Sequence, residues 1–245
     1  MKTNRTTRLL RTNLKDLLQG YIEHCEVSPH LMARIDLPII YHGFRFGAPV
    51  FTHQGPTAGN GQRDIIGLIG RNGPDSNIAS DVLLQFIEIL SQQPHLAGPS
   101  ILRILPVANP VALELGDAAP SAEGWPILDH LITRFQDEAA DGLIEILPSR
   151  EAGYLLEGSA NSHMFAALRD VAESVDTPSP RPRVLIPSRI SVSPIPAELK
   201  WNLRLHVPVT WKDAPEIHAV ARFLSRLIHL LTRNARSGDR ERHSF

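Results

Sequence analysis

The chain has 245 residues, and 42% of them are hydrophobic, which suffices for the core of one large α/β domain or two small ones. A formal net charge of −1 excludes the strong positive field of a protein that binds nucleic acid or an anionic membrane surface, so we expect neither partner. The single cysteine, Cys25, excludes an internal disulfide and a multi-cysteine metal site.

The hydropathy pattern favours a cytoplasmic protein. Its longest apolar runs are short, such as IIGLIG at 65–70, and none approaches the roughly 20 residues that cross a bilayer. The N-terminal stretch MKTNRTTRLLRTNLKDLL is basic but has no apolar signal core.

The first part of the chain predicts a helix and then a hairpin. Leucine and isoleucine recur at three- and four-residue spacing over residues 7–24, which is typical of an amphipathic helix. In the segment LPIIYHGFRFGAPVFTHQGP the apolar runs are broken at His42–Gly43 and at Gly47. We interpret this segment as two short antiparallel strands at 37–42 and 49–53, followed by a loop at 57–63.

The rest of the chain alternates strands with helices. Nearly continuous apolar runs predict strands that are buried on both faces of a mostly parallel sheet, at 64–70, 99–110 and 141–148. Further strands are predicted at 153–158 and 203–211, and helices at 78–90, 126–138, 161–175 and 214–233. We expect the polar residues 234–245 to form a disordered tail.

This order predicts the fold class. Strands alternating with helices indicate an α/β domain of three layers, α/β/α, with a mixed, mostly parallel sheet and helices on both faces. No change in composition marks a second domain, so we expect residues 1–233 to form a single domain.

Four segments carry a resemblance to a known family: IIGLIGRNGPDSNIASDVLLQFIEIL, ILPVANPVALELG, GLIEILPSREAGYLLEG and VPVTWKDAPEIHAVARFLSRLI. Their order and spacing resemble the zinc carboxypeptidase superfamily, above all its succinylglutamate desuccinylase/aspartoacylase-like branch. The resemblance covers roughly residues 7–233. It implies a fold in which a His, a Glu and a second His hold zinc, while a later Glu acts as the base for a zinc-bound water.

At the four positions that this resemblance assigns to catalysis, the sequence departs from the family. Asn72 falls where the first His belongs, and its amide is a poor zinc ligand. Asp75 replaces the Glu, and Pro148 replaces the second His without offering any ligand atom. Lys212 falls near the base, where a protonated amine cannot accept a proton and would repel a dication. We therefore expect no catalytic residue and no metal ligand at these positions.

The remaining candidates line the same predicted cleft. Asn109 matches the Asn of the family's substrate-side motif, whereas no arginine follows it as the family pattern requires. Arg150 and Glu151 follow a strand end, where they either face the former pocket or form a solvated turn. The candidate ligand-binding residues are thus Arg71, Asn72, Asp75, Asn109, Arg150, Glu151 and Lys212.

Other chemistries have no sequence signature. None of the 11 histidines is spaced His-x-x-x-His or His-x-His, and a regrouped metal site from His53, His163 and Asp75 has no supporting pattern. The glycines of GNGQRDIIGLIG cluster before the strand instead of after it, which differs from a dinucleotide fingerprint. The sequence also contains no phosphate-binding loop with Gly-Lys-Ser/Thr and no Gly-x-Ser-x-Gly elbow.

Three hypotheses remain open from the sequence. The favoured one is a non-catalytic, metal-free member of this fold whose former active-site cleft binds a small anionic or peptide-like ligand or a protein partner. The second is an active metal-dependent hydrolase, a carboxypeptidase or amino-acid deacylase with a divergent zinc site. The third is a structural or assembly subunit, and the sequence does not indicate an oligomeric state.

Overall fold

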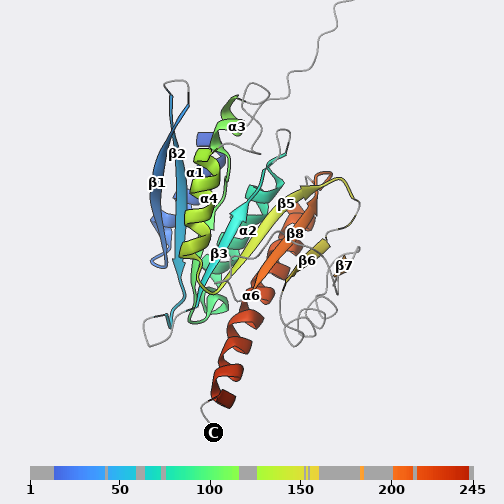
Figure 1. The fold of residues 1–245 in the computed structure, drawn as a ribbon. Coiled ribbons are helices and arrows are strands. Elements are labelled where there is room, and N and C mark those ends of the chain that lie inside the picture. The colour runs from blue at the N-terminus through green and yellow to red at the C-terminus, as the bar shows by residue number, and fades with distance from the viewer. Residues whose placement is uncertain are drawn as a thin grey trace, which may run out of the picture.

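The computed structural model describes residues 14–41, 44–58, 64–72, 76–115, 126–151, 153, 155–159, 183–184, 201–211 and 214–242. In this part of the chain a mixed sheet has helices on both faces, giving the three layers seen in Figure 1. The sheet has eight strands in the order β1-β2-β4-β3-β5-β8-β6-β7. The predicted α/β class is confirmed.

The elements have the following bounds. The strands are β1 (Leu31–Tyr41), β2 (Phe44–Gln54), β3 (Ile65–Gly70), β4 (Ile101–Leu105), β5 (Gly142–Ser149), β6 (Leu155–Ser159), β7 (Arg183–Val184) and β8 (Asn202–Pro208). The helices are α1 (Leu14–Val27), α2 (Ile78–Gln92), the 3-10 helix η1 (Pro94–Ala97), α3 (Pro110–Leu115), α4 (Pro126–Glu138) and α6 (Ala214–Arg242).

Parallel strands form the centre of the sheet. β4, β3, β5 and β8 run in the same direction, whereas β2 on one side and β6 on the other are antiparallel to their neighbours. The central strands have continuous apolar runs because both of their faces are covered. Leu68 and Ile69 are adjacent in β3 and so point to opposite faces, and both are fully buried. The carboxyl ends of the four central strands therefore lie at one edge of the sheet.

Each face of the sheet has its own hydrophobic core. On the first face, α1, α2 and α6 pack against Leu68 and the other side chains of the sheet that point to the same side. Phe86 of α2 and Leu224 of α6 belong to this core. On the second face, α4 packs against Ile69 through Leu131 and Phe135. Gly67 allows this close approach, because a Cβ there would lie 2.7 Å from the Cβ of Ala139.

Some boundaries differ from the predictions. Both strands of the hairpin are longer than predicted, because their cross-strand pairing runs from Leu31–His53 to Tyr41–Phe44 and passes through the glycine-containing segment. α6 continues past its predicted end at residue 233 to Arg242. The predicted helix at 161–175, residues 7–13 of the first helix, most of the 57–63 loop and residues 243–245 lie outside the described residues.

Within the described residues, no helix has both the length and the apolar character that a membrane crossing requires. The division into one domain over residues 1–233 remains a prediction.

Candidate functional site

The predicted site residues follow the carboxyl ends of the central strands. Arg71 and Asn72 come directly after β3, Asn109 comes after β4, and Arg150 and Glu151 come after β5. This edge is where ligands bind in open α/β sheets. Asp75 and Lys212 lie outside the described residues, so their predicted place at this edge stays a prediction.

The side chain of Asn72 holds neighbouring elements together through both ends of its amide group. Its Nδ2 donates hydrogen bonds to Ser80 Oγ at 2.6 Å and to the carbonyl oxygen of Pro106 at 3.3 Å. Its Oδ1 accepts a hydrogen bond from the backbone N–H of Ser80 at 3.2 Å, in the first turn of α2. Asn72 thus connects the end of β3 with the start of α2 and the end of β4.

This connection, which we call the Asn72 clasp, comprises Asn72, Ser80, Pro106 and Tyr21. Ser80 Oγ donates to the Pro106 carbonyl at 2.7 Å, and Tyr21 Oη of α1 donates to the Ser80 carbonyl. Burial, with the charge of Asp81 adding to it, raises the pKa of Tyr21 well above its ordinary value, so the hydroxyl remains a donor. Gly70 is required beside the clasp because a Cβ there would lie 2.1 Å from the Pro106 oxygen.

The other described candidates act locally. Asn109 precedes α3, and its Oδ1 accepts a hydrogen bond from the N–H of Ala112 at 2.9 Å, as a helix N-cap does. Arg150 and Glu151 are exposed in a turn in which the Glu151 N–H donates to Ser149 Oγ at 3.1 Å. Pro148 lies half-buried in β5 in register with Val207 of β8, and its ring offers no lone pair to a ligand.

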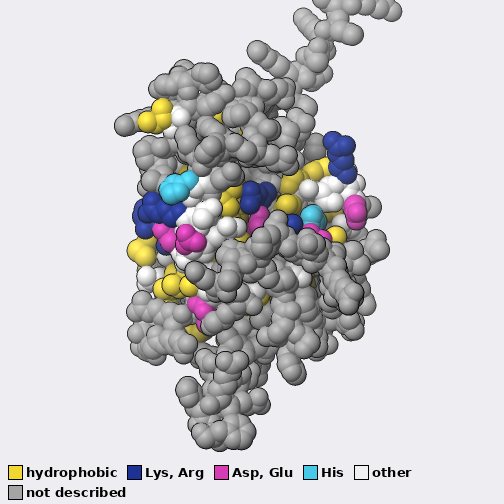
Figure 2. Space-filling model, viewed as in Figure 1, with side chains coloured by type: hydrophobic (Ala, Val, Ile, Leu, Met, Phe, Trp, Pro, Cys, Tyr) yellow, Lys and Arg dark blue, Asp and Glu magenta, His cyan; other side chains and the backbone are white. Residues whose placement is uncertain are grey.

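A set of charged residues, of which only Arg71 is a candidate site residue from the sequence, lies on the second face of the sheet. We call it the charged row; it comprises Arg71, Glu145, Arg204, Glu157 and His206. Glu145, Arg204 and Glu157 are in register on the adjacent strands β5, β8 and β6. Figure 2 shows basic, acidic and histidine side chains gathered in the middle of this face.

One ion pair and one hydrogen-bond contact organise the charged row. Arg71 Nε donates to Glu145 Oε2 at 2.8 Å, and only 5% of the Glu145 side chain is exposed. His206 Nε2 lies 2.9 Å from Glu157 Oε1. Arg71, a predicted cleft residue, therefore neutralises a buried carboxylate. The sequence signal for this row is the alternation of NLRLHVP, in which Arg204 and His206 occupy every second position between apolar residues.

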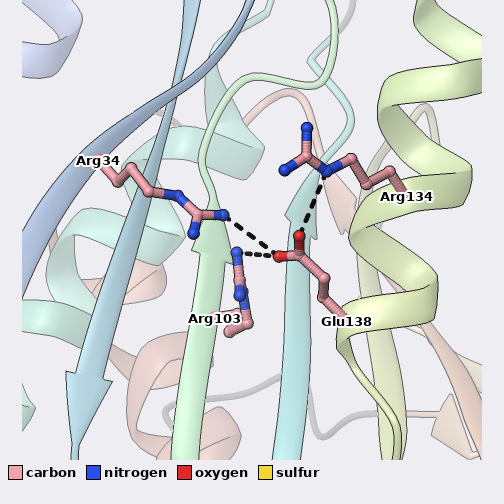
Figure 3. Close-up of polar contacts among 4 residues, drawn as sticks. All are labelled: Arg34, Arg103, Arg134 and Glu138. Atoms are coloured by element: carbon pink, nitrogen blue, oxygen red, sulfur yellow. Dashed lines mark hydrogen bonds and ion pairs between the residues drawn. The ribbon is translucent and has the colours of Figure 1, made fainter.

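A second charge cluster lies at the end of α4. Arg34 of β1, Arg103 of β4 and Arg134 of α4 surround the carboxylate of Glu138, as Figure 3 shows. Arg34 Nη2 and Arg134 Nε each lie 3.3 Å from this carboxylate, and Arg103 forms an ion pair with it. All three arginines have further interactions, and the cluster connects the helix to the sheet.

The described histidines do not assemble a metal site. His53 is fully buried in β2, in register with Leu102 near the amino end of β4, and this position is away from the carboxyl edge. In the described residues no group of three His, Cys, Asp or Glu side chains is placed to hold a metal ion. His163 and Asp75, the partners of the regrouped site considered from the sequence, lie outside those residues.

Solved structures with the same arrangement identify the fold. A metallo-carboxypeptidase from Burkholderia cenocepacia superimposes with a TM-score of 0.66 at 12% identity, over 91% of this chain and 70% of that one. A metallo-carboxypeptidase from Pseudomonas aeruginosa, solved with (2-guanidinoethylmercapto)succinic acid, gives a TM-score of 0.59 at 12% identity over 91% and 69% of the two chains. The chain has a carboxypeptidase-like fold.

The carboxypeptidase-like fold extends to a neighbour with another named role. The ectoine utilization protein EutE (DoeB) from Ruegeria pomeroyi, solved with its product bound, matches with a TM-score of 0.55 at 12% identity, over 81% of this chain and 66% of that one. Protein-family models and curated protein sequences give no match to this chain. At these identities the likeness concerns the fold, and the site must be judged from its own residues.

Judged in this way, the described ligand positions do not fit a zinc ion. The amide of Asn72 uses both of its ends within the clasp, and Pro148 has no side-chain donor atom. Catalytic zinc takes three protein ligands from imidazole, thiolate or carboxylate groups, and neither position supplies one.

Proposed function

We propose that this chain is a non-catalytic member of the carboxypeptidase-like fold, closest to its succinylglutamate desuccinylase/aspartoacylase-like branch, which binds a small anionic or peptide-like ligand or a protein partner. The site is the carboxyl edge of the central strands. No reaction step is assigned to it, and it works without a resident metal.

The Asn72 clasp carries this proposal. In the family pattern the residue at this position is a metal ligand and must direct its side chain toward the metal. Here the side chain makes three hydrogen bonds to Ser80 and Pro106, and turning it toward a metal would break all of them. Each broken bond to a buried partner costs about 1–3 kcal/mol, so the clasp opposes metal binding at this position.

The charge at this edge supports an anionic ligand. Arg71 of the charged row is about one-third exposed although it pairs with Glu145, and Arg150 is exposed after β5. Lys212, a predicted cleft residue, would add a further positive charge. The Pseudomonas aeruginosa neighbour was solved with a succinic acid derivative, which supports the use of this fold for binding a carboxylate.

Isothermal titration calorimetry with N-acetyl amino acids that bear aliphatic, acidic and basic side chains tests the proposal. We expect the purified wild-type protein to bind at least one of them, and Lys212→Ala to weaken that binding about tenfold, the effect of losing one ionic contact. No free amino acid should be released on prolonged incubation. Turnover would favour the hydrolase hypothesis, and flat titrations for both proteins would remove support for ligand binding.

A further inference from the structure

Two polar atoms on β8 are buried without hydrogen-bond partners. Asn202 is only 6% exposed, and its Oδ1 has no partner; Arg204 is half-buried, and its Nε has none either. Buried polar groups in folded proteins are satisfied in the great majority of cases, because an unpaired one costs about 1–3 kcal/mol. Two such atoms on one strand therefore require an explanation.

The neighbouring carboxylates do not supply it. Arg204 lies in register between Glu145 and Glu157, but Glu145 forms an ion pair with Arg71 and Glu157 is in hydrogen-bond contact with His206. Among the described residues, no side chain forms an ion pair or hydrogen bond with the Arg204 guanidinium. A guanidinium in this state offers donors in a planar fork that matches a carboxylate.

Asn202 and Arg204 point to the same side of the sheet. Residues two apart on a strand share a face and are separated by about 6.7 Å. Asn202 therefore presents an acceptor, and Arg204 a cationic donor, on the same face of β8, the second face of the sheet. A molecule whose carboxylate and N–H group are a few bonds apart can therefore form one hydrogen bond with each of the two side chains.

We propose that Asn202 and Arg204 form a subsite for a small molecule that carries both a carboxylate and an amide N–H. The carboxylate accepts hydrogen bonds from the Arg204 guanidinium, and the N–H donates to Asn202 Oδ1. This subsite lies toward the amino end of β8, so it is separate from the proposed site at the carboxyl edge of the central strands. An uncharged amide suits the buried, uncharged oxygen of Asn202 better than an ammonium group does.

A panel of three probes separates the two contacts. N-acetylglycine carries both groups, acetate carries only the carboxylate, and N-methylacetamide carries only the amide. Binding of each probe to the full chain is measured by calorimetry and by ligand-observed NMR. The variants are Arg204→Lys, which keeps the charge but loses the fork, and Asn202→Leu, which keeps the approximate volume but loses the acceptor. Arg222→Lys, at an exposed position of α6, is the matched control.

We expect N-acetylglycine to bind the wild-type protein more tightly than the other two probes do. Arg204→Lys should lower the affinity for N-acetylglycine about tenfold. Asn202→Leu should weaken the binding of N-acetylglycine and leave the binding of acetate unchanged. It should not lower the melting temperature of the protein, because it removes a buried unpaired oxygen. A purely structural Asn202 would show no such difference between the two probes. Arg222→Lys should bind like the wild-type protein.

Two results would overturn this assignment. If the wild-type protein binds N-acetylglycine and both β8 variants bind it equally well, the subsite is wrong while the proposed function stands. If the wild-type protein binds none of the three probes, the subsite is also wrong, and the proposed function is then decided by the titrations with larger N-acetyl amino acids.

Discussion

His53 and Asp81 are buried titratable residues whose pKa values are shifted in opposite directions. Burial, with His30 adding to it, lowers the pKa of His53 from 6.5 to about 4. Burial raises the pKa of Asp81 from 3.8 to about 6. The folded chain therefore binds fewer protons at His53, and more at Asp81, than the unfolded chain does over overlapping pH ranges.

The signs follow from this comparison. His53 favours the folded state fully above pH 6.5, and this contribution is lost as the pH falls toward 4. Asp81 acts oppositely: its contribution is fully present below pH 3.8 and is lost as the pH rises through 6. Between pH 4 and 6 the two contributions oppose each other, so the wild-type pH dependence conceals both.

Removing either group should reveal the other. With Asp81→Asn we expect the unfolding free energy to fall more steeply than in the wild-type protein as the pH drops, by up to roughly 3 kcal/mol from the His53 shift. With His53→Leu we expect it to rise relative to the wild-type protein over the same range. Urea unfolding at a series of pH values measures both, with exposed His95→Gln as control. Superimposable pH profiles for all four proteins would contradict the assignment.

At the scale of elements, α4 has a second attachment to the sheet besides its apolar face. Glu138 is its last residue, where a carboxylate meets the negative end of the helix dipole and is disfavoured. The surrounding arginines reverse that preference (Figure 3). Arg103 is the most buried of the three, with 15% of its side chain exposed, and its guanidinium carbon lies 6.0 Å from the ring centroid of Phe135.

Glu138→Gln should lower the unfolding free energy by about 2 kcal/mol, because it leaves the buried Arg103 without its carboxylate. Arg34→Ala removes a contact whose arginine is 52% exposed, and we expect a loss below about 0.5 kcal/mol. Chemical unfolding of both variants at low and high salt measures the difference. Equal losses for the two variants would show that burial of Arg103 does not set the cost.

Elements differed in how far their sequences predicted them. The strands β3, β4 and β5 were recognisable because burial on both faces leaves apolar runs such as IIGLIG. The hairpin was underpredicted, since its first strand, LMARIDLPIIY, includes charged residues and a proline and is fixed by pairing with β2. Pairing across strands is a tertiary effect that local patterns do not report.

At the scale of the whole molecule, the order of the elements along the chain is enough to predict the fold but not the charged row. The row takes its members from β3, β5, β8 and β6, so it exists only after strands distant in sequence become neighbours. The Asn72 clasp is similar, because Asn72 meets Pro106 thirty-four residues further along the chain. The departures from zinc-binding residues at Asn72 and Pro148 were visible in the sequence, but the structural use of Asn72 was not.

The metal content of the protein tests the central claim most directly. The full chain, purified without a chelating resin, is equilibrated with excess zinc, desalted and measured by elemental analysis, with a metallo-carboxypeptidase of the same fold as control. We predict zinc well below a stoichiometric amount, because Asn72 is held by its clasp and Pro148 has no ligand atom. Stoichiometric, tightly bound zinc in the wild-type chain would contradict the claim.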